Sequence, residues 1–136
     1  MLDTLLKHTV KEISPKNALG KKNAVFLDAR KLEEYNVSHI AKAIRVGYSD
    51  FTISKLPAIK KNTALIVYCS VGYRSEKISE KLLAAGYTNV QNLYGGIFEW
   101  VNQGYAVQDS TGLTPNVHAF NKDWGKWLQA GTKKYN

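Results

Sequence analysis

The sequence has little cysteine: Cys69 is the only one among 136 residues. A single cysteine excludes a disulfide within the chain, so an oxidised Cys69 cannot be resolved by a second thiol of the same molecule. The histidines are also few, and they lack metal-ligand spacing: His8, His39 and His118. We therefore expect no zinc or iron site and no bound cofactor.

Long hydrophobic segments are absent as well. No run of about eighteen apolar residues occurs, so no membrane span is expected. At the amino terminus, Asp3 and Lys7 interrupt the apolar residues, unlike in a secretory signal. The sequence as written therefore predicts a cytoplasmic protein, and an exported form would require a leader that has been removed ahead of Met1.

Acidic residues are few relative to basic ones. Lysine and arginine total 19 against 11 aspartates and glutamates, which gives a formal net charge of +8. Such an excess attracts anionic substrates, acidic protein partners or nucleic acid. The lysines are scattered and match no nucleic-acid motif, which favours a solvated basic surface over an RNA-binding stripe. RNA or membrane binding is the weaker alternative and would show a steep salt dependence.

What is present is ordinary for a folded globular chain. Apolar residues make up 44% and charged residues 22% of the sequence, which argues against disorder. The length suits one domain that spans residues 1–136.

The pattern changes from strand to helix around the cysteine. Residues 65–68 are apolar and partly β-branched, which predicts a strand buried on both faces. Ile78 and Leu82 then lie four positions apart with polar neighbours, and Gly86 follows as a helix stop. Cys69 therefore lies in a tight turn between a strand's carboxyl end and a helix's amino end.

This turn suits an anionic sulfur. Ligand sites in open α/β sheets form outside the carboxyl ends of the strands, and free amides at a helix N-terminus favour negative charge. Gly72 lets the backbone turn, and Arg74 adds a permanent cation. The alternative is a small apolar cysteine buried for packing, which does not require a glycine, an arginine and a helix N-terminus together.

The residues from Cys69 to Ser75 closely resemble the active loop of rhodanese domains. Further segments resemble the family's Asp-Val-Arg, Glu-Tyr, Gly-His-Ile-Pro-Gly-Ala and Gly-Gly-x-x-x-Trp motifs in the right order: Val25–Arg30, Glu34–Tyr35, Ser38–Ala43 and, after Gly86–Tyr87, Leu93–Trp100. The resemblance covers about residues 10–108. Ser38 replaces a usual glycine, and Ala41–Lys42 replaces a usual Pro-Gly.

The alternation of strand and helix signals predicts βαβ units and a parallel sheet. The resemblance implies an α/β, rhodanese-like fold, with a central parallel sheet of about five strands and helices on both faces. We expect strands near residues 12–14, 24–28, 43–46, 65–68 and 89–93. We expect helices from Pro15 to before Gly20, around Leu32 and Tyr35, from Ser75 to Gly86 and from Gly96 to Gly104, with one helical turn within residues 47–63.

Two extensions flank the expected core. Apolar residues of the first ten positions share one helical face, which predicts a lead-in helix over residues 1–10. In the tail, aromatic and apolar residues at helical spacing predict a helix over about residues 115–130 that docks on the domain: Phe120, Trp124, Trp127 and Leu128. The alternative for this stripe is a surface that binds a partner.

The resemblance also implies a sulfurtransferase. Its catalytic Cys69 thiolate would take sulfane sulfur from a small anionic donor, thiosulfate or a persulfide, and pass it to a thiol or protein acceptor. The intermediate would be a covalent cysteine persulfide, held by a binding loop of Ser70, Val71, Gly72, Tyr73 and Arg74. The alternative function is a non-catalytic carrier or sensor of sulfane sulfur, or a protein-interaction module.

Loop length and charge refine this expectation. Cysteine-dependent phosphatases place a longer loop between cysteine and arginine, whereas only Ser70–Tyr73 intervene in this chain, and a tighter ring suits one sulfur atom better than phosphate or arsenate. The loop has no second cation beside Cys69, so we expect a persulfide to be a better donor than thiosulfate.

Asp28 ends the strand expected at residues 24–28 and Arg30 lies just beyond it, so both should lie at the same sheet edge as Cys69. Either Asp28 anchors the loop, for example through an ion pair with an arginine, or the two residues contact substrate in the pocket.

Overall fold

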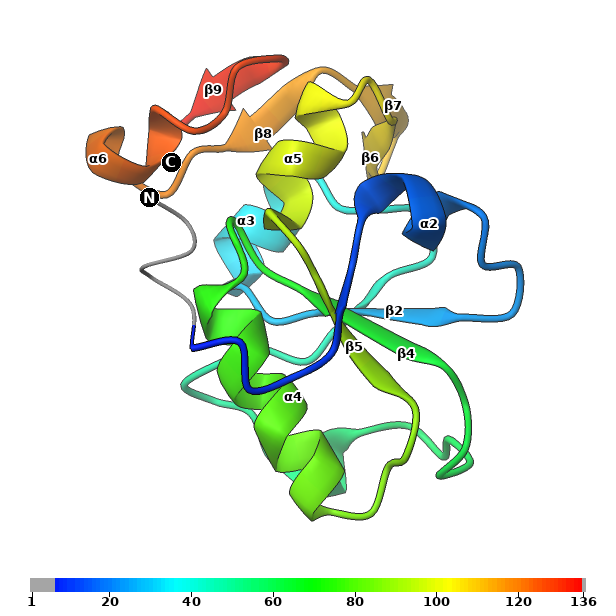
Figure 1. Cartoon of the computed structure of the whole chain (residues 1–136). Coiled ribbons are helices and arrows are strands. Elements are labelled where there is room, and N and C mark those ends of the chain that lie inside the picture. The colour runs from blue at the N-terminus through cyan, green and yellow to red at the C-terminus, as the bar shows by residue number, and fades with distance from the viewer. Residues whose placement is uncertain (1–6, 136) are drawn as a thin grey trace.

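The computed structural model describes residues 7–135, and these form an α/β fold around one parallel sheet (Figure 1). The sheet has five strands in the order β1-β5-β4-β2-β3, and every neighbouring pair is parallel. The strands are β1 Glu12–Ile13, β2 Val25–Asp28, β3 Ile44–Arg45, β4 Leu65–Tyr68 and β5 Val90–Leu93. This architecture confirms the predicted fold class.

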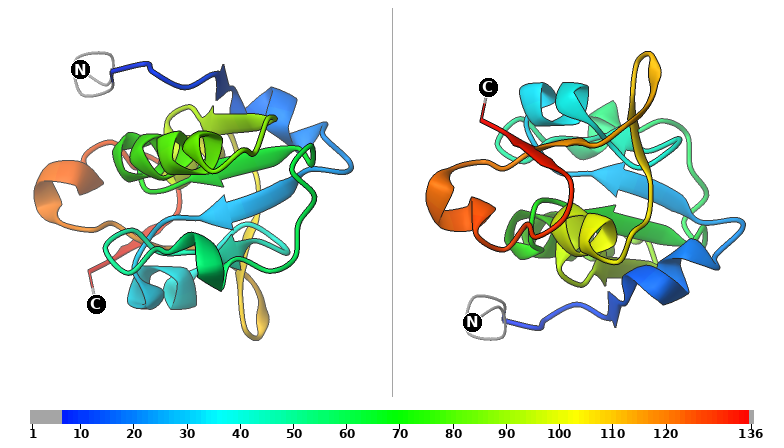
Figure 2. Two further views of the ribbon diagram at one scale, coloured as in Figure 1. Left: turned by 90° about the horizontal axis from the view of Figure 1, so that it is seen from below. Right: turned by 90° about the horizontal axis from the view of Figure 1, so that it is seen from above.

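Helices cover both faces of the sheet. They are α2 Pro15–Leu19, α3 Leu32–Val37, the 3-10 turn η1 Ile53–Lys55, α4 Tyr73–Ala84 and α5 Gly96–Asn102. In Figure 1, α4 lies below the strands, and α2, α3 and α5 lie above them. The two views of Figure 2 look onto these two faces, from below and from above.

The central strand β4 explains the two layers. Its residues alternate between the faces: Leu65 and Val67 pack with α4, whereas Ile66 and Tyr68 pack with α5. All four side chains are buried, because the strand has apolar neighbours on both sides. The carboxyl end of β4 therefore delivers Cys69 to an edge that helices from both layers reach.

Local signals place several helix ends where the sequence predicts them. Ser14 caps α2, because its side chain accepts the Asn17 N–H, and Pro15 occupies the first helical position. The helix after the cysteine begins earlier than expected, at Tyr73 instead of Ser75. Gly72 has φ 120° and turns the chain directly into the helix, so Tyr73 and Arg74 belong to its first turn.

The C-terminal segment corrects the expected helix over about residues 115–130. It contains the parallel strand pair β8 Asn116–His118 and β9 Thr132–Lys134, with only the short helix α6 Lys122–Gly125 between them. The helical spacing of the aromatic residues fails as a guide because Phe120 has φ 69°, which a right-handed helix cannot include. A hairpin of β6 Val107–Asp109 and β7 Gly112–Thr114 precedes this segment.

This segment nevertheless packs on the domain. Val117 and Leu128 are buried in the same apolar cluster as Tyr68 and Ile97, and Trp124 and Trp127 pack against that cluster. At the other end, the predicted lead-in helix falls largely on residues 1–6, which lie outside the described residues, and residues 7–10 form neither helix nor strand.

Candidate active site

Cys69 is held at the junction of β4 and α4. Its side chain is buried, with 1% of its surface exposed. The Gly72 N–H donates to Sγ at 3.1 Å, and Ser75 Oγ lies 3.5 Å from the same sulfur. Among the loop residues Ser70–Arg74, Gly72 is the one whose backbone N–H makes this hydrogen bond within residues 7–135. An N–H aimed at sulfur beside a helix N-terminus stabilises negative charge on it.

Asn92 anchors the loop from the neighbouring strand β5. Its Nδ2 donates to the Gly72 carbonyl at 3.0 Å, and its Oδ1 accepts the Ser75 hydroxyl at 2.6 Å. The Asn92 side chain has no exposed surface, so these hydrogen bonds replace the water that it lost on folding. Asn92 was not predicted as a site residue, although a polar residue inside a core strand is a signal that could have identified it.

The amino end of α5 holds the loop from the opposite side. The Ile97 and Phe98 N–H groups donate to the Cys69 and Ser70 carbonyls at 2.9 and 3.1 Å. A helix's first amides have no partner within the helix, so the loop carbonyls satisfy them. Gly96 permits this contact, because a Cβ there would lie 2.4 Å from the Ser70 carbonyl oxygen.

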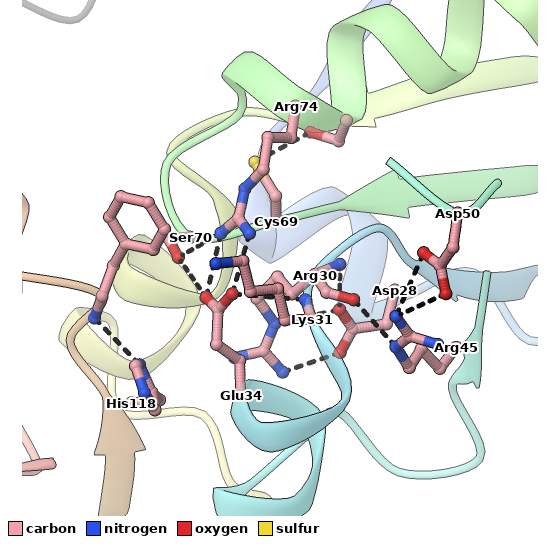
Figure 3. A network of polar contacts seen from close by, with 12 residues as sticks. Asp28, Arg30, Lys31, Glu34, Arg45, Asp50, Cys69, Ser70, Arg74 and His118 are labelled. Carbon is pink, nitrogen blue, oxygen red and sulfur yellow. Dashed lines mark hydrogen bonds and ion pairs between the residues drawn. The ribbon is translucent and has the colours of Figure 1, made fainter. Parts of the chain in front are cut away.

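Arg74 forms a bidentate ion pair with Glu34 of α3 (Figure 3). Its Nη1 and Nη2 donate to Glu34 Oε1 and Oε2 at 2.8 and 2.9 Å, and Nη2 also donates to Ser70 Oγ at 2.9 Å. Burial by itself raises the pKa of Glu34, but the hydrogen bonds and charge of Arg74 lower it overall. Burial likewise lowers the pKa of Arg74, but Glu34 and negative charge at Cys69 raise it overall. The permanent positive charge predicted for Arg74 is therefore compensated by the Glu34 carboxylate, a partner that was not predicted from the sequence.

This ion pair predicts a pH-dependent stability. The folded-state pKa of Glu34 lies below the ordinary value of 4.5. The ionised Glu34 therefore contributes to the free energy of unfolding above pH 4.5, and this contribution is lost as the pH falls through the folded-state pKa. We expect Glu34→Gln to lower the free energy of unfolding at neutral pH by about 3 kcal/mol, because it leaves the Arg74 charge unpaired. We also expect the variant's unfolding free energy to fall less than the wild type's between about pH 5 and pH 3.

Denaturant unfolding across this pH range measures both effects. Glu33→Gln is the matched control, since Glu33 is the exposed neighbour on the same helix. A Glu34→Gln protein with the stability and acid dependence of the control would contradict the assignment.

Asp28 and Arg30 lie beneath the site. Arg30 Nε and Nη2 donate to the two Asp28 oxygens at 2.9 and 2.7 Å, and Nη2 also donates to the Ser38 carbonyl at 2.7 Å. Neither side chain has exposed surface. Burial by itself lowers the pKa of Arg30, but Asp28 raises it overall. This geometry matches the anchoring alternative. The Asp28–Arg30 pair holds the segment that leads from β2 into α3, and the bond to Ser38 holds the turn after α3.

A surface hollow of about 550 Å³ adjoins Arg74. Apolar and charged side chains share its lining, among them Leu32, Tyr48, Phe120, Lys31, Arg45 and Arg74. Of the other predicted loop residues, Val71 is buried in the cluster on the α5 face, and Tyr73 is half-buried. The structure thus brings Cys69, Ser70, Gly72 and Arg74 together and directs Val71 into the core.

Neither a metal-binding cluster nor a membrane-spanning helix is found among the described residues. Within residues 7–135, no group of three or more histidine, cysteine, aspartate or glutamate side chains is placed to hold a metal ion. In the same part of the chain, no helix combines the length and apolar character that a bilayer crossing needs.

Comparison with known proteins identifies the family. The sequence model of the Rhodanese-like domain matches residues 14–103, which is most of the chain. The protein therefore belongs to the rhodanese-like domain family, as the sequence motifs predicted.

The relatives come from different kinds of protein. The chain is 34% identical over 92 residues to "Protein HIGH ARSENIC CONTENT 1, mitochondrial" of Arabidopsis thaliana, which covers 60% of this chain and 54% of that protein. It is 33% identical over 89 residues to a tRNA uridine(34) hydroxylase of Buchnera aphidicola, with 62% and 28% covered. The matches thus span about half or less of these relatives' lengths.

A solved structure supports the fold assignment. Thiosulfate sulfurtransferase from Pseudomonas aeruginosa superposes with a TM-score of 0.64 at 28% identity, covering 88% of this chain and 23% of that one. The rhodanese-like family thus includes named enzymes with different reactions, and the reaction of this chain has to be argued from its own site.

Proposed function

We propose that the protein is a sulfurtransferase that carries sulfane sulfur as a persulfide on Cys69. The observation that supports this most strongly is the hydrogen bond from the Gly72 N–H to Sγ at 3.1 Å, at the first turn of α4. The loop around that sulfur is anchored by Asn92, by α5 and by the Arg74–Glu34 pair. Such an arrangement positions a nucleophile and the donors that stabilise its charge before any substrate arrives.

The reaction is a pair of displacements. In the first, the Cys69 thiolate attacks the outer sulfur of a donor R–S–SH, a new S–S bond forms, and the donor's S–S bond breaks. The thiol RSH leaves with the proton, and Cys69 keeps the sulfur as the anion Cys69–S–S⁻. With thiosulfate the leaving group is sulfite. In the second, an acceptor nucleophile takes the outer sulfur and regenerates the thiolate, so the protein undergoes no net oxidation.

The surroundings of the site favour a persulfide with an organic part over thiosulfate. The two arginines of the adjoining hollow have carboxylate partners: Arg74 pairs with Glu34, and Arg45 with Asp50 at 3.1 Å. Their charges are therefore largely compensated, which weakens attraction for a small dianion. Apolar side chains in the hollow, such as Leu32 and Tyr48, suit the carbon atoms of a larger donor.

Intact mass spectrometry tests the proposal, because Cys69 is the chain's only thiol. After incubation with glutathione persulfide, we expect a mass gain of one sulfur atom that cyanide removes. With thiosulfate we expect slower formation of the same adduct. Absence of an adduct with both donors would refute the sulfurtransferase, and faster loading from thiosulfate would refute the donor preference.

The burial of Cys69 supports a second candidate, a carrier that holds sulfane sulfur without rapid turnover. Only 1% of the surface of Cys69 is exposed, so its sulfur is poorly accessible to a bulky acceptor. Repeated cycles with cyanide or a small thiol distinguish the two functions. A single round of loading with no sustained turnover would favour the carrier.

A further inference from the structure

Phe120 contacts the candidate site although it lies outside the family-matched residues 14–103. Its ring centroid is 4.9 Å from the guanidinium carbon of Arg74. Arg74 directs its polar contacts toward Glu34 and Ser70, so Phe120 supplies an apolar cover for the same guanidinium. A ring at this distance attracts a cation and excludes water from its face.

The backbone of Phe120 adopts a conformation that side chains rarely take. Its φ is 69°, in the left-handed region, which is unfavourable for an aromatic residue. Neighbouring hydrogen bonds maintain it: the Phe120 N–H donates to His118 Nδ1 at 3.0 Å, and the Ala119 N–H donates to the Lys134 carbonyl at 2.7 Å. Such strain persists where the surrounding structure enforces it, and it is often found at functional sites.

Phe120 places the C-terminal segment beside both members of the Arg74–Glu34 ion pair. Its side chain lines the hollow of about 550 Å³ together with Arg74. It also lines a second hollow of about 210 Å³ together with Glu34 and His118. Phe120 thus lies between these two hollows, beside the Arg74–Glu34 ion pair. The attraction between these two charges is stronger when water is excluded.

We infer that Phe120 is a positioning residue of the active site: its ring holds the Arg74 guanidinium against Glu34 and Ser70 and so keeps the Cys69 loop in its reactive geometry. The role rests on the proposed sulfur transfer. It makes the C-terminal segment a part of the site and not merely a cover for the core.

Three substitutions at Phe120 separate the effect of the aromatic ring from the effect of the backbone strain. Phe120→Tyr keeps an aromatic ring, Phe120→Leu keeps only apolar cover, and Phe120→Gly removes the side chain and relieves the left-handed strain. Lys42→Gly is the matched control, because Lys42 is exposed, has φ 65° and lies outside the site.

The maximal rate of Cys69 persulfide formation is the first measurement. We expect Phe120→Tyr to stay within about twofold of the wild type, Phe120→Leu to be about threefold slower and Phe120→Gly to be about tenfold slower, which is the scale of a desolvated cation–π contact. Phe120 also lines the hollow proposed for the donor's carbon atoms, so the donor concentration for half-maximal rate is determined separately. A change in that concentration reports contact of the ring with the donor, whereas the maximal rate reports the positioning of Arg74. Lys42→Gly should leave the rate unchanged.

The second measurement is independent of sulfur chemistry. The chain has only three arginines, Arg30, Arg45 and Arg74, so the side-chain N–H signals of Arg74 can be assigned by NMR. We expect their exchange with solvent to accelerate about tenfold in Phe120→Gly and to stay near wild type in Phe120→Tyr and Lys42→Gly.

These measurements test the proposed sulfur transfer and the positioning role of Phe120 separately. A wild-type protein that takes up no sulfur would refute the proposed function, and the exchange rates would then test the positioning role alone. Unchanged Arg74 exchange in Phe120→Gly would overturn that role. A Phe120→Leu protein as fast as the wild type would show that the aromatic ring is unnecessary and would also overturn it.

Discussion

Replacement of Cys69 by serine is expected to abolish sulfur loading and turnover, with a fall of at least about a thousandfold. A serine hydroxyl is not ionised at neutral pH and forms no stable bond to sulfane sulfur under these conditions, so neither displacement can begin. The fold should survive, because serine is close to cysteine in size. The buried hydroxyl costs about 1 kcal/mol in the free energy of unfolding.

Thiocyanate release in the presence of cyanide measures the turnover, and intact mass measures the loading. A thermal melt of Cys69→Ser provides the control for folding. Sulfur transfer that persists in a folded Cys69→Ser protein would mean that another group accepts the sulfur, and the assignment of Cys69 would be wrong.

The second large effect is expected for Gly96→Ala. Gly96 has φ 61°, and a Cβ there would lie 2.4 Å from the Ser70 carbonyl oxygen and 2.5 Å from the Cys69 carbonyl oxygen. Both contacts are to backbone atoms, so the Cys69 loop or α5 has to move. We expect a loss of about 3 kcal/mol in unfolding free energy from the left-handed strain and the overpacking together.

Activity should fall with the displaced loop. The α5 amides would no longer bind the Cys69 and Ser70 carbonyls at their present distances, and the Gly72 N–H would no longer be aimed at Sγ. We expect persulfide formation to slow by more than about tenfold, since small displacements of reacting groups have large effects on rate.

Gly104→Ala is the matched control for this substitution. Gly104 follows the other end of α5, has φ 87°, and an added Cβ would meet nothing within 4 Å. It should therefore show only the conformational cost, about 1 kcal/mol, with normal sulfur loading. Equal stability losses and equal activities in the two variants would contradict the idea that Gly96 exists to admit the loop.

Much of the fold was predictable because its signals are local. The apolar run at residues 65–68, the Ser14 cap with Pro15 after it, and the glycines beside α5 each depend on neighbouring positions in the chain. The same is true of Cys69 at the end of a strand and before a helix. Motif order then identified the rhodanese-like family, which the family match to residues 14–103 confirms.

The helix predicted for the tail shows where a local signal fails. The spacing of Phe120, Trp124, Trp127 and Leu128 is helical, yet the chain forms strands and one short helix instead. Edge-to-face contacts join Phe120 to Trp124 and Trp124 to Trp127, and Leu128 is buried in the core. Burial against the domain thus outweighed the helical periodicity.

The sequence by itself predicted Cys69 as the candidate nucleophile, the loop that follows it and the α/β class, because each prediction depends on residues that are adjacent or regularly spaced. Only the tertiary structure decided what holds the loop: Glu34 binds Arg74 from 40 positions away, and Asn92 binds the Gly72 carbonyl from 20 positions away. These partners meet because parallel strands bring their carboxyl ends to one edge and because buried charges and amides require partners there. No spacing in the chain encodes such a contact, so the tertiary structure was needed to turn a reactive-looking cysteine into a defined site.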